Sequence, residues 1–301
     1  MIRPTRTSPA TLLALCLCAA CATPTSGDVP QETAQAVDVL DGPLGELLSD
    51  LMYGAPDARQ HAAGELAELG TDAAPAVPHL IQALEDSDPA VRALAAKALG
   101  VVGGDVAPRV HALANRLSAD EEEGVQTQAA DALVALGSAS TDVFLEGMDH
   151  SRASVRRQCA RALGMAEDAA PGALDRLITA LDDSDAQVRR NAAESIGRIG
   201  AQEDRVVQPL IRSLGDESDK VRAEAAHSLG LCGKRAKRAV LPLVDALRDE
   251  SAAVRLRSAE ALGALGPDAA QASMDLNGAL ADPNPKVAEQ VRAALAKIQR
   301  D

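Results

Sequence analysis

Side chains that could perform catalysis or hold a metal are few in this chain, and they are scattered. The five histidines fall in separate stretches, without the close pairs of ligands that a zinc site needs: His61, His79, His111, His150 and His227. No glycine-rich phosphate loop, nucleophile elbow or zinc motif occurs. These patterns predict a protein that is not an enzyme and that uses no metal and no cofactor.

The cysteines fall into two groups. Cys159 and Cys232 lie among small apolar residues at helical spacing, so we expect them to be buried side chains rather than redox groups. They are also far apart in the repeat described below, which argues against a disulfide between them. The remaining cysteines lie within the first 21 residues, where a different chemistry is indicated.

The amino-terminal segment "MIRPTRTSPATLLALCLCAAC" has the layout of a secretory signal. Two arginines precede an apolar run that is too short to cross a bilayer, which takes about 20 helical residues. Ala19-Ala20-Cys21 resembles a bacterial lipobox, although that family usually has leucine where this chain has Cys18. The resemblance implies a signal peptide over residues 1–20, and an exported lipoprotein whose Cys21 carries fatty acids such as palmitate.

That lipoprotein would be anchored to a membrane of the cell envelope and face the periplasm or the cell surface. An ordinary signal peptide, cut after Ala20 or Ala22, is the alternative. Residues 21–42 are rich in Thr, Pro, Ser, Gly and Asp and are predicted to form a flexible tether.

The distribution of charged residues limits the classes of macromolecule that the protein can bind. Residues 21–150 carry 22 acidic and 5 basic side chains, whereas residues 151–301 carry 22 and 23. Nucleic-acid binding requires a basic surface, so the acidic first half excludes it as a general function.

One sequence motif recurs along the chain. "DSDAQVRRNAAESIGRIG" at 183–200 is followed by "DESDKVRAEAAHSLGLCG" at 216–233 and by "DESAAVRLRSAEALGALG" at 249–266. The valines that mark the repeat lie 30–34 residues apart, at Val91, Val125, Val155, Val188, Val221, Val254 and Val287. With a first unit around Arg59, about eight units occupy residues 43–301, a period typical of solenoids.

Each unit contains two helical patterns and no strand pattern. Apolar residues before the valine recur at helical spacing, and the valine, an alanine pair and a leucine or isoleucine form a stripe after it. Capping residues before the second helix are Asp88, Asp185, Ser218, Ser251 and Asn284. Glycines follow the second helix, where a left-handed turn that favours glycine is predicted, at Gly103, Gly200, Gly233 and Gly266.

An aspartate precedes the repeat valine by five residues and an arginine follows it by one. These pairs are Asp86/Arg92, Asp183/Arg189, Asp216/Arg222 and Asp249/Arg255. Together with the "AAxxLGxxG" pattern, this spacing resembles the HEAT repeat, in particular its short bacterial and phycobilin-lyase-like form. The resemblance implies an all-α solenoid, or superhelix, in which the Asp and Arg side chains form a ladder between adjacent units.

The ladder is interrupted in the middle of the chain. Gln126 replaces the arginine of the third unit, and His150 replaces the aspartate of the fourth. The first helix of the fourth unit is also short. We therefore expect altered curvature or a looser joint around residues 117–155.

The second helix of each pair lines the concave side in related solenoids. Side chains two, three and six residues after the repeat valine would then face a partner. The candidate partner-binding residues are Arg157, Arg161, Arg190, Asn191, Glu224, His227 and Arg257. The first three predict a basic patch; a solvated surface of mixed charge is the alternative. "GKRAKRAV" at 233–240 is a second basic cluster, which could face anionic lipid, a partner or solvent.

The function indicated is a non-catalytic scaffold that binds another protein on its concave face. One Tyr, one Phe and no Trp leave few of the aromatic anchors common in tight interfaces, so a charge-guided contact is expected. Two alternatives remain: an enzyme similar to the phycobilin lyases, which attach tetrapyrroles to cysteines, and an assembly factor of an envelope complex.

Overall fold

The structure is a computed structural model that describes residues 42–165 and 172–299. The predicted signal peptide (1–20), Cys21 and all of the tether except Gly42 lie outside the described residues. Every regular element within them is helical, and no strand occurs there. The prediction of an all-α fold is confirmed.

The helices form eight consecutive pairs in the described residues. The first helices are α2 (Pro43–Tyr53), α4 (Val77–Ala83), α6 (Val106–Ala119), α8 (Thr141–Gly147), α10 (Ala173–Ala180), α12 (Val207–Ser213), α14 (Val240–Ala246) and α16 (Ser273–Ala279). The second helices are α3 (Pro56–Leu69), α5 (Pro89–Val101), α7 (Glu123–Ala135), α9 (Ala153–Leu163), α11 (Ala186–Ile199), α13 (Asp219–Leu231), α15 (Ala252–Leu265) and α17 (Pro285–Ile298). Short 3-10 segments between pairs are η2 (Gly70–Ala76), η3 (Gly137–Ser140), η4 (Asp204–Val206), η5 (Gly233–Ala239) and η6 (Gly266–Ala272).

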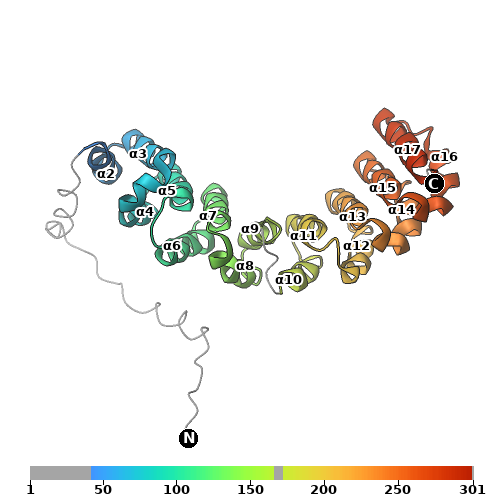
Figure 1. The fold of residues 1–301 in the computed structure, drawn as a ribbon, viewed down its shortest axis with the longest axis horizontal. Coiled ribbons are helices and arrows are strands. Elements are labelled where there is room, and N and C mark those ends of the chain that lie inside the picture. The colour runs from blue at the N-terminus through green and yellow to red at the C-terminus, as the bar shows by residue number, and fades with distance from the viewer. Residues whose placement is uncertain (1–41, 166–171, 300–301) are drawn as a thin grey trace, which may run out of the picture. The chain divides into compact units, whose positions relative to one another are not determined.

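The helices pack in the order of the sequence (Figure 1). Each second helix contacts its own first helix and the second helices of the neighbouring units. The repeat valines lie in the core between them, and none of the seven is more than 1% exposed. This arrangement confirms a solenoid of eight two-helix units.

Helix starts follow the predicted caps in part. The side chains of Asp88, Asp185 and Asn284 each accept a backbone N–H from the first turn of the helix that follows. Ser218 and Ser251 hold the same position but make no side-chain cap bond. Their own N–H groups donate to the ladder aspartates at 2.8 Å, as those of Asp88, Asp185 and Asn284 also do.

Glycine nine residues after the repeat valine lets neighbouring second helices approach closely. A Cβ atom on Gly230 would lie 3.1 Å from Cα of Ala261, and one on Gly263 would lie 2.9 Å from Cα of Ala294. Side chains are excluded there because the contact is with backbone. The third unit has Val134 at this position, and α7 and α9 share the least extensive contact between neighbouring second helices.

The predicted turn glycines differ among themselves. Gly233 and Gly266 have positive φ values of 53° and 59°, which favour glycine. Gly200 has φ −108°, so its backbone does not require glycine, and next to Gly103 it is Gly104 that has the positive φ. The prediction of a left-handed turn was therefore wrong at positions 103 and 200.

Cys159 and Cys232 are buried, as expected from the sequence. Burial raises the pKa of the Cys159 thiol to about 12 and that of Cys232 to about 11. Both side chains are therefore neutral thiols at physiological pH, where the thiolate needed for redox chemistry is scarce.

Candidate protein-binding surface

The ladder arginines hold adjacent units together. Arg189 Nε lies 2.7 Å from Asp216 Oδ2, and its Nη2 lies 2.9 Å from Asp216 Oδ1. Its Nη1 donates to the carbonyl oxygen of Asp183 in its own unit, at 2.9 Å. The guanidinium thus binds its own turn through the backbone and the next turn through a bidentate ion pair.

The same geometry recurs at six junctions. The pairs are Arg59–Asp86, Arg92–Asp120, Arg156–Asp183, Arg189–Asp216, Arg222–Asp249 and Arg255–Asp282. Burial alone would raise the pKa of Asp216, but hydrogen bonds from Arg189 and from the Ser218 N–H outweigh it and hold the pKa below its ordinary value. The ladder side chains are occupied by one another and have a structural role.

The gap in the ladder is filled by different bonds. Gln126 Nε2 donates to the carbonyl oxygen of Asp120 at 2.7 Å, while its buried Oε1 has no hydrogen-bond partner. His150 Nδ1 accepts the Arg152 N–H at 3.1 Å, the bond that an aspartate makes elsewhere. Burial, and the nearby charges of Arg152 and Arg156, lower the pKa of His150.

Arg152 replaces the missing ladder arginine as the link between these units. Its Nη1 reaches back from the start of α9 to the carbonyl oxygen of Asp120, at 2.8 Å. This bond has a single neutral acceptor, whereas the ladder bond has a carboxylate with two oxygens. Arg152 was not predicted from the sequence, since no other unit has an arginine at this capping position.

The second-helix face is the row of side chains two, three and six residues after each repeat valine on α7, α9, α11, α13 and α15. Arg157 on this face donates to Asp185, with Nε 2.9 Å from Oδ1 and Nη2 2.5 Å from Oδ2. It also lies 3.6 Å from Glu123. Arg161 donates to Asp131 at 2.6 Å and to Gln158.

Arg190 is the least constrained of the three arginines predicted to form a basic patch. Its Nε lies 3.8 Å from Glu224 Oε2, and its side chain is 39% exposed. Asn191 donates to the carbonyl oxygen of Arg157 at 2.9 Å, which ties α11 to α9. Because all three arginines have a carboxylate nearby, the surface carries mixed charge, which was the alternative to a basic patch.

Glu224 is the most enclosed carboxyl on the second-helix face. Its side chain is 17% exposed. Burial and the neighbouring Glu194 raise its pKa, against the opposing effect of His227, Arg190 and Arg257. Arg257 itself pairs with Glu260 at 2.7 Å. The structure thus brings Arg190, Glu224, His227 and Arg257 into one charged cluster across α11, α13 and α15.

Within residues 42–165 and 172–299, no group of three or more His, Cys, Asp or Glu side chains is placed to hold a metal ion. Over the same part of the chain, the helices are too short or too polar to cross a membrane.

The stacked helix pairs and the arginine–aspartate ladder define an α-solenoid. The sequence matches the family model for HEAT repeats over residues 44–134, 77–163, 141–230 and 207–296, so the chain belongs to the HEAT-repeat family. No curated protein sequence matches the chain.

Solved structures support the fold. The crystal structure of YibA from E. coli matches with a TM-score of 0.61 and 21% identity, covering 92% of this chain and 100% of YibA. Kap121p matches with a TM-score of 0.67 and 16% identity over 90% of this chain and 34% of Kap121p. A chain of the Kap95p–RanGDP complex matches with a TM-score of 0.63 and 14% identity, covering 85% of this chain and 41% of that one. At these identities the likeness concerns the fold alone.

Proposed function

We propose that this protein is a non-catalytic scaffold that binds another protein along its second-helix face. HEAT repeats typically serve protein binding, and the described part of the chain contains no cluster suited to a metal. The observation that carries the proposal is the charged cluster of Arg190, Glu224, His227 and Arg257. These side chains are half-buried in a row while the fold itself is already held by the ladder.

The chemistry of the cluster favours a polar partner surface. Among the described residues Arg190 pairs with one distant carboxylate, and Glu224 is incompletely solvated, so both gain from a partner that supplies a matching charge. Contacts of this kind give specificity and fast association more than high affinity.

Photo-crosslinking in cells of the source organism tests the surface. A photoreactive amino acid at position 227 is expected to give a discrete adduct with one protein. The same residue at position 208 or 212, on α12, serves as the matched control and is expected to give none. The Arg190→Glu substitution should abolish the adduct formed from position 227. Equal adducts from both helices, or an adduct that survives Arg190→Glu, would contradict the proposal.

We further propose that Cys21 carries the lipid anchor of an exported envelope protein. The support is the sequence of residues 1–21, with its basic start, short apolar run and small residues before the cysteine. Radiolabelled palmitate should enter the wild-type protein and not the Cys21→Ala variant. Equal labelling of both, or no labelling of either, rejects the anchor without affecting the proposed binding surface.

A further inference from the structure

Segment η5, which leads from α13 into α14, presents a group of exposed cations. Its two alanines, Ala236 and Ala239, are fully buried. These alanines fix the orientation of the segment against the core, so the basic side chains between them point outward. The exposed cations are Lys234, Arg235, Lys237 and Arg238.

Two other segments show that the fold does not require cations here. Segments η2 and η6 have the same length as η5 and bury alanines at the same two positions. All three begin with a glycine of similar positive φ, 55° at Gly70, 53° at Gly233 and 59° at Gly266. The four positions that carry cations in η5 hold one aspartate and no cation in each of the other two segments. Their residues are Thr71, Asp72, Ala74 and Pro75 in η2, and Pro267, Asp268, Ala270 and Gln271 in η6.

Two of the four cations have a carboxylate nearby. Arg235 Nη1 lies 3.2 Å from Asp204 Oδ1, and Lys237 Nζ lies 3.3 Å from Asp268 Oδ1. These pairs lie at the surface, where ion pairs are weak. Both cations can therefore turn to another anion at little cost.

The other two cations, Lys234 and Arg238, make no ion pair with any residue that the structure describes. The whole chain carries a net charge of −14. Charges at the surface are screened beyond about 8 Å at physiological ionic strength. The acidic first half of the chain therefore does not cancel the positive charge of η5.

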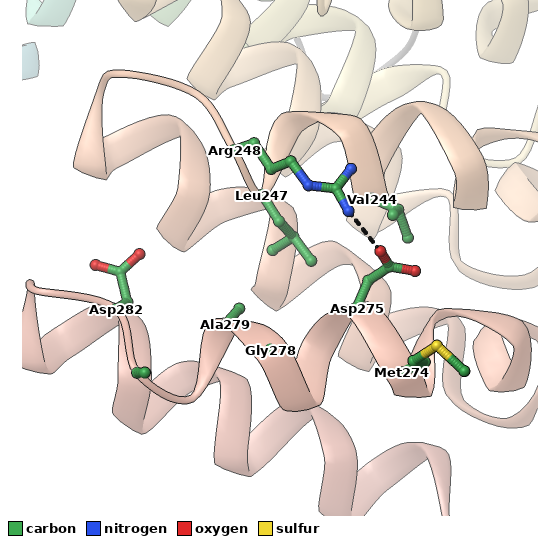
Figure 2. A pocket seen from close by; sticks show the side chains of 9 residues that line it. Val244, Leu247, Arg248, Met274, Asp275, Gly278, Ala279 and Asp282 are labelled. Atoms are coloured by element: carbon green, nitrogen blue, oxygen red, sulfur yellow. Dashed lines mark hydrogen bonds and ion pairs between the residues drawn. The ribbon is translucent and has the colours of Figure 1, made fainter.

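The carboxylates of the neighbouring groove between α14 and α16 are bound elsewhere. Arg248 donates to Asp275 at 2.7 Å, drawn as the dashed line in Figure 2, and lies 3.8 Å from Asp245. Asp282 belongs to the ladder and pairs with Arg255. None of these carboxylates pairs with a cation of η5 among the residues described.

Exposed leucines lie on both sides of the cations. Leu231, at the end of α13, is 46% exposed and lies three residues before Lys234. Leu241, in the first turn of α14, is 62% exposed and lies three residues after Arg238. The surface thus combines basic and apolar side chains within one short stretch of chain. That combination is typical of segments that bind the interface of a bilayer.

We propose that the η5 surface, made of Leu231, Leu241 and the four cations of η5, binds an anionic phospholipid membrane. The cations contact the phosphate groups, and the two leucines enter the interface beneath them. A bilayer presents negative charge and apolar depth together on a flat surface, so it fits an outward-facing turn. None of these six residues lines the groove between α14 and α16, where a protein segment could insert. The contact is independent of the second-helix face and of the anchor proposed at Cys21.

Vesicle sedimentation tests this contact. The full chain with Cys21→Ala is used, so that no attached lipid contributes to binding. It should bind vesicles of phosphatidylglycerol and phosphatidylcholine at least about tenfold more tightly than vesicles of phosphatidylcholine alone, because each cation near an anionic surface contributes about fivefold. At about 1 M salt the screening length falls to about 3 Å, and the difference should disappear.

Matched variants locate the contact. Lys234→Glu combined with Arg238→Glu should weaken binding to the anionic vesicles at least about tenfold. Lys286→Glu combined with Arg292→Glu changes the net charge equally at exposed positions of α17 and should bind as the parent protein does. Leu231→Ser combined with Leu241→Ser should weaken binding several-fold, a loss that added salt does not remove. All variants share the same amino-terminal segment, so its contribution cancels. Circular dichroism should show that each keeps its helices.

Three outcomes would overturn the proposal. The first is equal binding to the anionic and the neutral vesicles. The second is an equal loss of binding in the η5 variant and in the α17 control, which would reduce the effect to net charge. The third is a parent protein that does not sediment with anionic vesicles at low salt, which would reject the membrane in favour of an acidic protein. Palmitate labelling at Cys21 is unaffected by any of these results.

Discussion

Gly100 of α5 lies against the backbone of Ala132 of α7, so closely that a Cβ atom at position 100 would be 2.8 Å from Cα of Ala132. A side chain at this point must push the two helices apart. The same contact recurs between other neighbouring second helices, at Gly230 and Gly263. The first glycine of the AAxxLGxxG pattern is thus a packing residue, whereas the second lies in the turn.

Gly100→Ala is therefore expected to destabilise the protein by about 1–3 kcal/mol, as overpacking does in other cores. Gly278→Ala is the matched control, because a Cβ atom there meets nothing within 4 Å. It should leave stability unchanged or raise it by up to about 1 kcal/mol, the helix propensity of alanine over glycine. Urea unfolding followed by circular dichroism measures both. A Gly100→Ala protein as stable as the wild type would contradict the close approach of α5 and α7.

The ladder predicts a large difference between two adjacent arginines. Arg189→Gln leaves the part-buried carboxylate of Asp216 without its bidentate partner and should cost about 1.5–3 kcal/mol of the free energy of unfolding. Arg190→Gln removes a half-exposed side chain with one distant carboxylate and should cost no more than about 1 kcal/mol. Equal unfolding midpoints in urea for the two variants would refute a structural role for the ladder.

Acid should weaken the solenoid through its aspartates. Hydrogen bonds from Arg157, opposed by burial, lower the pKa of Asp185 to about 2. A carboxyl whose pKa is lower in the folded state stabilises the fold above its unfolded pKa of about 4. That contribution is lost as the pH falls from about 4 toward 2. Unfolding midpoints measured across this range should therefore fall, and fall less steeply in Asp185→Asn, whose side chain has no charge to lose.

The ladder gap predicts a coupled pair of substitutions. Gln126→Arg alone places a guanidinium opposite His150, whose pKa is already lowered and which has no carboxylate to offer. Combining Gln126→Arg with His150→Asp should rebuild the bidentate pair, with a favourable coupling of about 1–3 kcal/mol between the two sites. A double-mutant cycle on urea unfolding gives this coupling. Strict additivity would mean that the backbone at this junction does not present the two side chains to each other.

The helix pairs could be predicted from the sequence because each unit repeats the same apolar stripe, cap and turn. An unusual residue in one unit can be recognised by comparison with the same position in the others. The sequence also located the ladder, since the Asp–Arg spacing recurs in most units. The capping serines were a weaker signal, because Ser218 and Ser251 hold the cap position without making a side-chain bond to the first turn of their helices.

The surface was harder to predict than the core. The sequence placed Arg157, Arg161 and Arg190 near one another but gave no means to choose their acidic neighbours. Arg157 binds Asp185 in the next unit, and Arg161 binds Asp131 in the previous one. Which carboxylate each arginine binds depends on how far neighbouring helices are shifted along one another. The residue pattern within a single unit does not specify that shift.

In a repeat protein each unit is stabilised only by contacts with its immediate neighbours, so one weak junction separates the array into two parts. In this protein the weak junction is the one between Gln126 and His150. There the bidentate arginine–aspartate pair is replaced by single hydrogen bonds to a neutral carbonyl oxygen. The three units before it and the five after it should melt as two blocks rather than as one. A mechanical force applied through a bound partner would then separate the two blocks at this junction while each block stays folded.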